Sequence, residues 1–350
     1  MQGVDATPSG GEKIKVAVLG TGALGKEHAR IYADLAAAGK VDFVGVYDIA
    51  ADVARRYAEK YHLRTFGSVA EAAAACDALS IATPTSSHFE LAGALLGKGR
   101  HVLVEKPMTQ TAAQAAELVQ MAQANRCILQ VGHVERFNPV FKYLETVATA
   151  PRFIETHRLS PYPARSTDIG VVLDLMIHDL DVVLAFVKSP VVSVDAVGIP
   201  VLSQSEDIAN ARLRFANRCV ANLTVSRVSP ERMRKIRVFS GGATRSYISL
   251  DYRAQEGFIY RIAREGEVQS SLLQKLWHAK DSVIVSEFAG KRIVREPVPI
   301  VKEEPLKTEL QHFVDCVAAH RTPLVSGESA KRALDLALEI TRQVQEAQGS

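Results

Sequence analysis

Apolar residues form short, uninterrupted runs in the first 130 residues of the chain. Val16-Ala17-Val18-Leu19 is apolar at four successive positions, which is typical of a strand buried on both faces of a parallel sheet. Alanine-rich segments of helical length separate this run from later ones, and strands that alternate with helices indicate an α/β domain. The predicted strands are 14–19, 41–47, 78–82, 102–104 and 128–131, and the predicted helices are 23–38, 52–61, 86–98 and 112–125.

The hydrophobic pattern changes after about residue 150. Several extended segments now alternate apolar and polar residues, and Gly241-Gly242 between two of them predicts a hairpin turn. Together with flanking helices, these segments predict an open sheet with helices on one face. The predicted strands are 211–215, 221–227 and 236–240, and the predicted helices are 171–187, 306–320 and 328–348.

The chain is thus predicted to be an α/β protein with two domains, because 350 residues rarely share a single core. Residues 1–12 are rich in small residues and lack an apolar stretch, so we expect a flexible N-terminus rather than a signal peptide. Residues 13–132 are predicted to form an N-terminal Rossmann domain with a doubly wound parallel sheet. Residues 133–350 are predicted to form a C-terminal α+β domain with an open, mostly antiparallel sheet.

Composition excludes several classes of protein. The chain holds 42 Lys and Arg against 39 Asp and Glu, a net charge of +3 that gives no reason to expect nucleic acid as a partner. No segment offers the roughly 20 uninterrupted apolar residues that a membrane span needs. The cysteines lie far apart without a CxxC pair, which favours reduced thiols and a cytoplasmic protein. They are Cys76, Cys127, Cys219 and Cys316.

A glycine-rich motif follows the first predicted strand. Residues Gly20, Thr21, Gly22, Ala23, Leu24 and Gly25 form a GxGxxG between that strand and a helix, the context in which glycines let a pyrophosphate approach the backbone at a helix N-terminus. The next strand ends at Asp48, whose carboxylate is placed to accept hydrogen bonds from ribose hydroxyls and would repel a 2′-phosphate. We therefore expect NAD as the cofactor in preference to NADP. A glycine-rich turn in another doubly wound fold is the alternative.

Further motifs follow the later strands in a characteristic order. The glycine motif extends to His28 as GxGxxGxxH, Thr83-Pro84 precedes His88 in a TPxxxH, Glu105-Lys106-Pro107 forms an EKP, and Asp174 precedes His178 in a DxxxH. This combination resembles the Gfo/Idh/MocA family of sugar and cyclitol oxidoreductases, from about Lys13 to the end of the chain. The resemblance implies that Thr83, Pro84, His88, Glu105 and Lys106 help to bind the cofactor, and that Lys106 also lies beside the substrate hydroxyl as a catalytic residue. The alternative is a surface lysine before a turn proline.

Asp174 and His178 lie within the predicted apolar helix, and their i, i+4 spacing places them on one helical face. Burying both is costly unless they face a site or a partner. The resemblance implies that His178 is the catalytic acid/base. It also implies that Asp174 binds the substrate and tunes His178. An imidazole suits removal of a hydroxyl proton near neutral pH. Met176 replaces the family's usual glycine, which suggests tighter packing, and a hydrogen-bonded core histidine is the alternative.

We expect no metal site. His178, Asp179 and Asp181 could be considered as ligands, but on one helix these three side chains do not all point the same way. No second group of His, Asp or Glu with ligand spacing is apparent in the sequence.

Three segments resemble a narrower group within the family, the UDP-N-acetylglucosamine 3-dehydrogenases, which prepare a 3-keto sugar nucleotide for the diamino sugar of lipid A. The resemblance implies a sugar or sugar-nucleotide substrate, and Arg136, Arg158 and Arg165 could meet its diphosphate with bidentate contacts. Surface arginines in loops are the alternative for these residues. The segments are 131–139, 158–168 and 304–310, the last followed by 323–327.

Two other functions stay open from the sequence, a dehydrogenase for a free sugar or a cyclitol such as myo-inositol, and a non-catalytic NAD-binding regulator on the same fold. An open sheet face requires covering, so we also expect a homodimer or homotetramer formed through that face.

Overall fold

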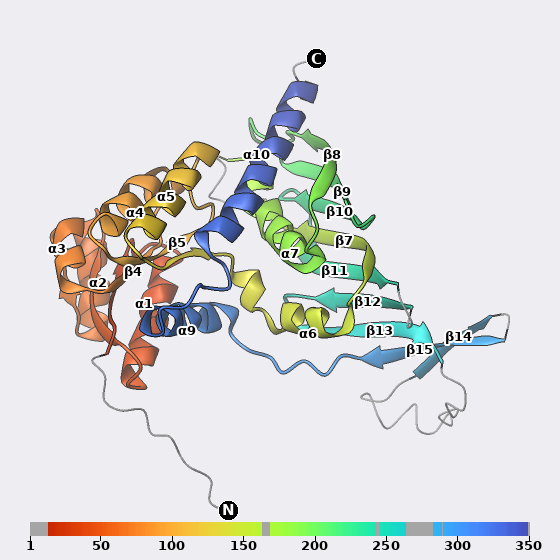
Figure 1. The fold of residues 1–350 in the computed structure, drawn as a ribbon, viewed down its shortest axis with the longest axis horizontal. Coiled ribbons are helices and arrows are strands. Elements are labelled where there is room, and N and C mark those ends of the chain that lie inside the picture. The colour runs from red at the N-terminus through yellow and green to blue at the C-terminus, as the bar shows by residue number, and fades with distance from the viewer. Residues whose placement is uncertain (1–12, 163–168, 242–244, 264–282, 289, 349–350) are drawn as a thin grey trace, which may run out of the picture. The chain divides into compact units, whose positions relative to one another are not determined.

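The computed structural model describes residues 13–162, 169–241, 245–263, 283–288 and 290–348 (Figure 1). The chain divides into two compact units. The first unit comprises Met1–Gly132 and Leu306–Glu328, and the second comprises His133–Pro305 and Ser329–Ser350.

The first unit is built on a six-stranded parallel sheet with the order β3-β2-β1-β4-β5-β6. This order is that of dinucleotide-binding folds, in which ligands bind at the carboxyl ends of the strands, where the strand order reverses. Here the reversal lies between β1 and β4. The prediction of a Rossmann sheet is confirmed. The strands are β1 (Lys15–Leu19), β2 (Asp42–Tyr47), β3 (Arg64–Thr65), β4 (Ala78–Ile81), β5 (His101–Glu105) and β6 (Leu129–Gly132).

The helices of this unit follow the predicted order with two additions. The short β3 and α3 were not predicted, and the helix expected at 86–98 begins with a 3₁₀ turn. The bounds are α1 (Gly25–Ala37), α2 (Ala51–Tyr61), α3 (Val69–Ala75), η1 (Thr85–Ser87), α4 (His88–Leu96), α5 (Ala112–Ala124) and α9 (Pro305–Ala318).

Helix α9 departs from the predicted domain boundary at residue 133. Its apolar side chains Leu310, Phe313 and Val314 are buried in one cluster with Val16 and Ile31 of the first unit. The amphipathic pattern predicts that α9 buries one face, but periodicity cannot say which distant segment receives it. The Rossmann core is therefore completed by a helix that lies far along the chain.

The second unit contains a nine-stranded sheet with the order β14-β15-β13-β12-β11-β7-β10-β9-β8. Strand pairs are antiparallel apart from β7 and β10, so the prediction of a mostly antiparallel sheet is confirmed. The expected hairpin joins β11 and β12, although Gly242 lies outside the described residues. The strands are β7 (Pro151–Leu159), β8 (Val191–Ile199), β9 (Ile208–Phe215), β10 (Val220–Ser226), β11 (Met233–Ser240), β12 (Ser246–Asp251), β13 (Glu256–Ile262), β14 (Val283–Phe288) and β15 (Lys291–Pro297).

Helices cover one face of this sheet (Figure 1). Side chains that point to the helices, such as Ile154, Val238 and Ile248, are fully or almost fully buried. At β8 the approach is so close that a Cβ atom on Gly198 would lie 2.7 Å from Val344 of α10. The helical segments are η2 (Val134–Phe137), α6 (Pro139–Val147), η3 (Val172–Met176), α7 (Ile177–Val187) and α10 (Gly327–Gln348).

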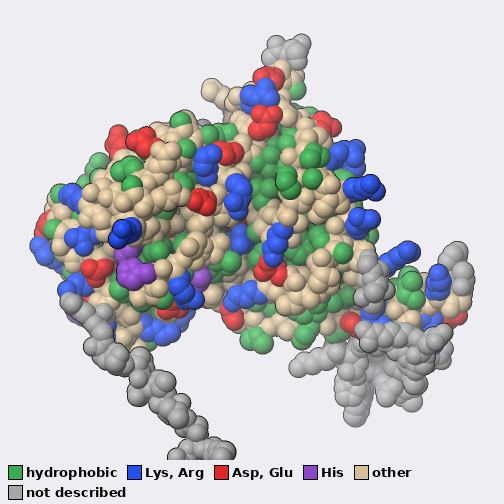
Figure 2. Space-filling view, viewed as in Figure 1, with side chains coloured by type: hydrophobic (Ala, Val, Ile, Leu, Met, Phe, Trp, Pro, Cys, Tyr) green, Lys and Arg blue, Asp and Glu red, His purple; other side chains and the backbone are tan. Residues whose placement is uncertain are grey.

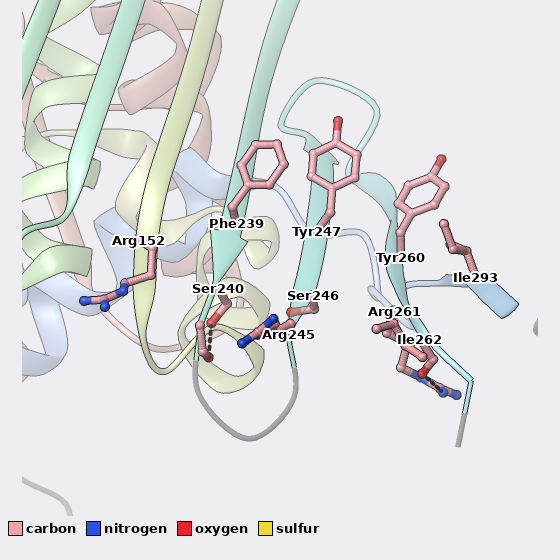
Figure 3. Close-up of a pocket in the computed structure, with 11 residues that line it drawn as sticks. Arg152, Phe239, Ser240, Arg245, Ser246, Tyr247, Tyr260, Arg261, Ile262 and Ile293 are labelled. Atoms are coloured by element: carbon pink, nitrogen blue, oxygen red, sulfur yellow. Dashed lines mark hydrogen bonds between the residues drawn. The ribbon is translucent and has the colours of Figure 1, made fainter. Parts of the chain in front are cut away.

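The opposite face carries a row of aromatic side chains across four neighbouring strands, which we call the aromatic row. Its members are Phe153, Phe239, Tyr247 and Tyr260, with successive ring centroids 5.6, 4.7 and 5.3 Å apart. Figure 3 shows three of them, Phe239, Tyr247 and Tyr260. Phe239 is 40% exposed. The row borders a pocket of about 740 Å³ that is also lined by Arg152, Arg245 and Arg261.

The surface shows no dominance of one sign of charge on the face drawn in Figure 2, where basic and acidic side chains are interspersed. Among the described residues, no helix combines the length and apolar character that crossing a membrane requires.

Candidate active site

The glycine loop after β1 has the shape that a dinucleotide requires. Gly20 has φ +84°, and a Cβ atom there would lie 2.8 Å from the carbonyl oxygen of Ala82. A Cβ atom on Gly25 would lie 1.8 Å from the carbonyl oxygen of Gly20, so only glycine lets helix α1 start this close to the loop. At Gly22 the space is open, with nothing within 4 Å of an added Cβ atom. The loop is thus tightly packed against the protein at Gly20 and Gly25, and it leaves space at Gly22, where a pyrophosphate approaches in such folds.

The first turn of α1 and Asp48 complete this cradle. No side chain caps the helix at Leu24, so the positive end of the helix dipole faces the loop, although the amides of Lys26 and Glu27 already donate to the carbonyl oxygens of Gly22 and Leu24. One carboxylate oxygen of Asp48 accepts hydrogen bonds from the Thr21 amide at 2.7 Å and the Thr21 hydroxyl at 3.0 Å. The other accepts from the Ala50 amide at 3.0 Å. These contacts fix a partly exposed carboxylate beside the glycine loop, which fits the ribose of NAD.

The loop after β4 supports the site through His88. This imidazole is buried, and its two nitrogens lie 2.9 Å from the carbonyl oxygens of Pro107 and Thr83. Burial lowers the pKa of His88, although the two carbonyl groups act to raise it. Thr83 also accepts a hydrogen bond from the Ser87 hydroxyl at 2.8 Å, and Pro84 is exposed. Thus the contacts of His88 join the TPxxxH loop to the EKP loop.

Lys106 follows β5 and is partly exposed, whereas Glu105 before it is only 7% exposed. The Glu105 carboxylate contacts His28 and accepts a hydrogen bond from the Lys106 amide. Because β1, β4 and β5 are neighbouring parallel strands, the motifs that follow them share the carboxyl edge of the sheet, where nucleotides bind in such folds.

In the second unit, Asp174 and His178 lie where the apolar helix begins, and both are half-buried. The predicted helix at 171–187 is present, but its first turn, η3 (Val172–Met176), is π-helical. Asp174 lies in this wider turn and His178 in α7, so their spacing is not that of two residues in one α-helix. Met176, expected to pack tightly, is fully buried.

A second histidine lies against His178. The rings of His133 and His178 meet edge to face, with centroids 6.2 Å apart and an angle of 88° between the planes. His133 is 1% exposed. His133 lies in the segment 131–139 that resembles the narrower group, but no sequence pattern pointed to its contact with His178.

Two arginines expected at a diphosphate are instead used inside the second unit. Arg158 donates to both carboxylate oxygens of Asp179 at 3.0 Å and to Glu135 at 3.1 Å. Burial acts to lower the pKa of Arg158, but the two carboxylates raise it above its usual range. Arg136 is 6% exposed and lies 3.5 Å from Asp181. These contacts give both arginines a structural role, and Arg165 lies outside the described residues.

The turn that carries Asp174 is fixed by Glu206. Its side chain accepts a hydrogen bond from the Val172 amide at 3.2 Å, and its carbonyl oxygen accepts from the Val171 amide at 3.0 Å. A Cβ atom on Gly170 would lie 1.9 Å from the Glu206 carboxylate, so the glycine makes this approach possible. The sequence contained no signal for this pairing, which joins residues 34 positions apart.

A buried ion pair holds the neighbouring segment. Arg227 donates to Asp207 at 2.7 Å and to the carbonyl oxygen of Ile169 at 2.7 Å. Burial acts to raise the pKa of Asp207, but hydrogen bonds from the Leu202 amide and from Arg227 lower it overall. Within the described ranges, no group of three or more His, Cys, Asp or Glu residues is placed to hold a metal ion.

Comparisons with known proteins agree with this geometry. Residues 14–133 match the oxidoreductase family with an NAD-binding Rossmann fold, and residues 149–243 match the GFO/IDH/MocA C-terminal domain. The chain is 35% identical to UDP-N-acetylglucosamine 3-dehydrogenase of Acidithiobacillus ferrooxidans, over 93% of this chain and 96% of that protein. It is 24% identical to scyllo-inositol 2-dehydrogenase (NAD(+)) of Bacillus subtilis, over 94% and 93%.

Solved structures give the same result. The structure of the Acidithiobacillus ferrooxidans UDP-N-acetylglucosamine 3-dehydrogenase has a TM-score of 0.82 at 34% identity, and covers 95% of this chain and 98% of its own. The structure of GenD2 from gentamicin A biosynthesis, in complex with NAD, shares the fold with a TM-score of 0.75 at 18% identity, over 99% of this chain and 98% of its own. The chain therefore belongs to the Gfo/Idh/MocA family of oxidoreductases, and its Rossmann domain binds NAD.

Proposed function

We propose that the protein oxidises the C3 hydroxyl of UDP-N-acetylglucosamine to a ketone. The observation that carries this proposal is the 35% identity with a UDP-N-acetylglucosamine 3-dehydrogenase over nearly the full length of both chains. NAD, when bound, accepts the hydride from the carbon. The protein must supply a base for the hydroxyl proton, stabilise the charge on the oxygen and hold the sugar in place.

Three side chains have the chemistry for these tasks. His178 removes the hydroxyl proton, because an imidazole can accept a proton near neutral pH. The Lys106 ammonium donates a hydrogen bond to the same oxygen and stabilises its developing negative charge. Asp174 binds the sugar and orients His178. The half-buried positions of all three side chains are compatible with contact to a ligand.

A second candidate function is supported by the relative that acts on scyllo-inositol, at 24% identity over 94% of this chain. A cyclitol lacks the diphosphate and nucleoside of a sugar nucleotide, so the two candidates differ in what they require outside the reacting ring. A non-catalytic NAD-binding regulator is the third candidate. The presence of Lys106, Asp174 and His178 together argues against it.

The test is oxidation of a panel of alcohols, followed as NADH absorbance with an amine-dependent enzyme that consumes the ketone. We expect UDP-N-acetylglucosamine to reduce NAD, and N-acetylglucosamine, glucose and myo-inositol to do so far less. Contacts to the remote nucleotide hold the reacting carbon in position, so truncated substrates lose rate as well as affinity. The trap is needed because oxidation of a secondary alcohol by NAD is unfavourable at neutral pH.

Each outcome of this panel selects one candidate. Oxidation of myo-inositol without oxidation of UDP-N-acetylglucosamine would assign the chain to the cyclitol dehydrogenases. NADH binding without oxidation of any alcohol, with the trap present and at higher pH, would favour the regulator.

We also propose that the protein is a homodimer or homotetramer formed through the face that carries the aromatic row. Partly exposed apolar side chains lie on the β11–β13 side of this face, including Phe239 at 40% and Ile262 at 48% exposure. An exposed apolar patch of this kind marks an interface. A second copy would cover the row and fill the pocket beside it (Figure 3).

Replacing Phe239 with aspartate should therefore split the oligomer, because a carboxylate would be buried without a partner. The molar mass from light scattering should fall to that of one 38.0 kDa chain. Val301→Asp is the matched control, because Val301 is 78% exposed outside the sheet. A wild-type protein that already has the mass of one chain would refute this proposal.

A further inference from the structure

His28 belongs to the GxGxxGxxH motif but has no part in the proposed reaction. It lies on the buried face of α1 and is 0% exposed. Its Nε2 lies 3.1 Å from a carboxylate oxygen of Glu105. Among the residues that the structure describes, no hydrogen-bond partner is found for its Nδ1. A carboxylate oxygen can only accept, so the Nε2–H of His28 is the donor in the contact with Glu105.

Glu105 is held between His28 and the backbone of Lys106. One carboxylate oxygen accepts from His28, and the other accepts from the Lys106 amide at 3.2 Å. On a third side the carboxylate packs against Gly132, where a Cβ atom would lie 2.7 Å from its carbon and one oxygen. Glu105 was expected to bind the cofactor, but these contacts direct its carboxylate to His28 and to the residue that follows it.

We propose that His28 is a positioning residue for Lys106 and that it acts through Glu105. This inference rests on the role of Lys106 in the proposed function. The His28 N–H holds one carboxylate oxygen, which fixes the other oxygen under the Lys106 amide and so fixes where the lysine leaves the strand. Without this donor, a buried carboxylate lacks one of its two hydrogen bonds and must rotate, take up a proton or admit water.

The first measurement concerns turnover, with whichever alcohol the wild-type protein oxidises. His28→Leu should lower kcat on the order of 10- to 100-fold, as small displacements of a catalytic group do. The Kd for NADH should stay nearly unchanged. His28→Gln should recover most of the activity, because its side-chain amide can donate to Glu105, whereas the shorter His28→Asn should not. Equal turnover in the Gln and Asn variants would overturn the proposal, even if His28→Leu does not fold.

Tyr32→Phe provides the matched control. Tyr32 lies one turn further along the same helix, is fully buried and shares a 2.8 Å hydrogen bond with the Ser80 hydroxyl. Its loss should lower the melting temperature without lowering kcat. If Tyr32→Phe lowers kcat as much as His28→Leu does, then the loss of any buried hydrogen-bonding group in α1 has the same effect. This result would refute a specific role for His28.

The path through Glu105 is tested by a double-mutant cycle. If His28 acts only through this carboxylate, His28→Leu should have little further effect in a Glu105→Gln background, because coupled residues are not additive. If the two substitutions instead lower kcat independently, so that their effects multiply in the double variant, His28 does not act through Glu105. An independent readout needs no substrate: ¹⁵N NMR of the cofactor-free protein should show a proton on Nε2 of His28. An Nε2 without a proton would overturn the proposal.

The proposed function and this inference fail in different ways. If UDP-N-acetylglucosamine is not the substrate, the variants can still be compared with the alcohol that is oxidised. If Lys106→Ala keeps wild-type turnover, the role of the lysine is wrong, and the NMR signature of His28 then stands as a structural feature alone.

Discussion

Replacement of His178 by alanine is expected to lower kcat by about 100- to 10,000-fold, the usual loss when a general base is removed. Lys106→Ala should have an effect of the same order, because an oxyanion would form without its charged donor. NADH binding should persist in the His178 variant, since the glycine loop and Asp48 belong to the other unit. Steady-state turnover beside a fluorescence titration of NADH separates the two effects.

The control for this experiment is His62→Asn, which changes an exposed histidine at the end of α2. Asparagine tolerates the left-handed backbone conformation at this position, where φ is 56°. The control should keep wild-type kcat. Near wild-type turnover in His178→Ala would remove this histidine from the mechanism.

The second large effect concerns stability. Arg158→Met is expected to lower the free energy of unfolding by about 3–5 kcal/mol, because it leaves the buried carboxylate of Asp179 without its cation and Glu135 with Arg234 alone, 3.7 Å away. Arg158 itself is 4% exposed. Urea unfolding monitored by circular dichroism measures this loss.

Two further variants serve as comparisons. One also removes a buried carboxylate that pairs with Arg158, and the other removes ion pairs that are exposed to solvent. Asp179→Leu together with Arg158→Met should recover part of the loss, since fewer charges are left unpaired. Arg342→Ala removes exposed ion pairs on α10 and should leave stability nearly unchanged. If Arg158→Met is as stable as Arg342→Ala, the buried network does not hold the second unit together.

The first unit was predictable because its signals are local. The apolar run at Val16, the glycines from Gly20 and the acidic Asp48 follow one another within one βαβ unit, and their spacing alone determines what they do. The second sheet was predicted only in outline. Strand β8 alternates exposed and less exposed positions from Ser193 onward, but its exposed positions include Val197 and Ile199, so no alternation of apolar and polar residues marks it in the sequence.

In the candidate site, too, only the features with local sequence signals were predictable. Lys106, Asp174 and His178 were proposed from motifs, whereas Arg158 was only one of three arginines that could meet a diphosphate, because the sequence contained no sign of its partners. Its partners Glu135 and Asp179 lie 23 and 21 residues away, and no periodicity connects them. The π-helical turn at Asp174 was also missed, because the sequence gives no sign of the contacts that Glu206 makes with the amides of Val171 and Val172.

The position of α9 near the end of the chain determines when the core of the first unit can be completed during translation. The apolar strands of the first unit leave the ribosome early, but Leu310, Phe313 and Val314, which share their core, emerge only after residues 133–305. At roughly 5–20 residues per second, that delay lasts on the order of tens of seconds. During this interval the nascent Rossmann half presents an incomplete apolar surface, so its dependence on chaperones should be greatest while the second unit is being translated.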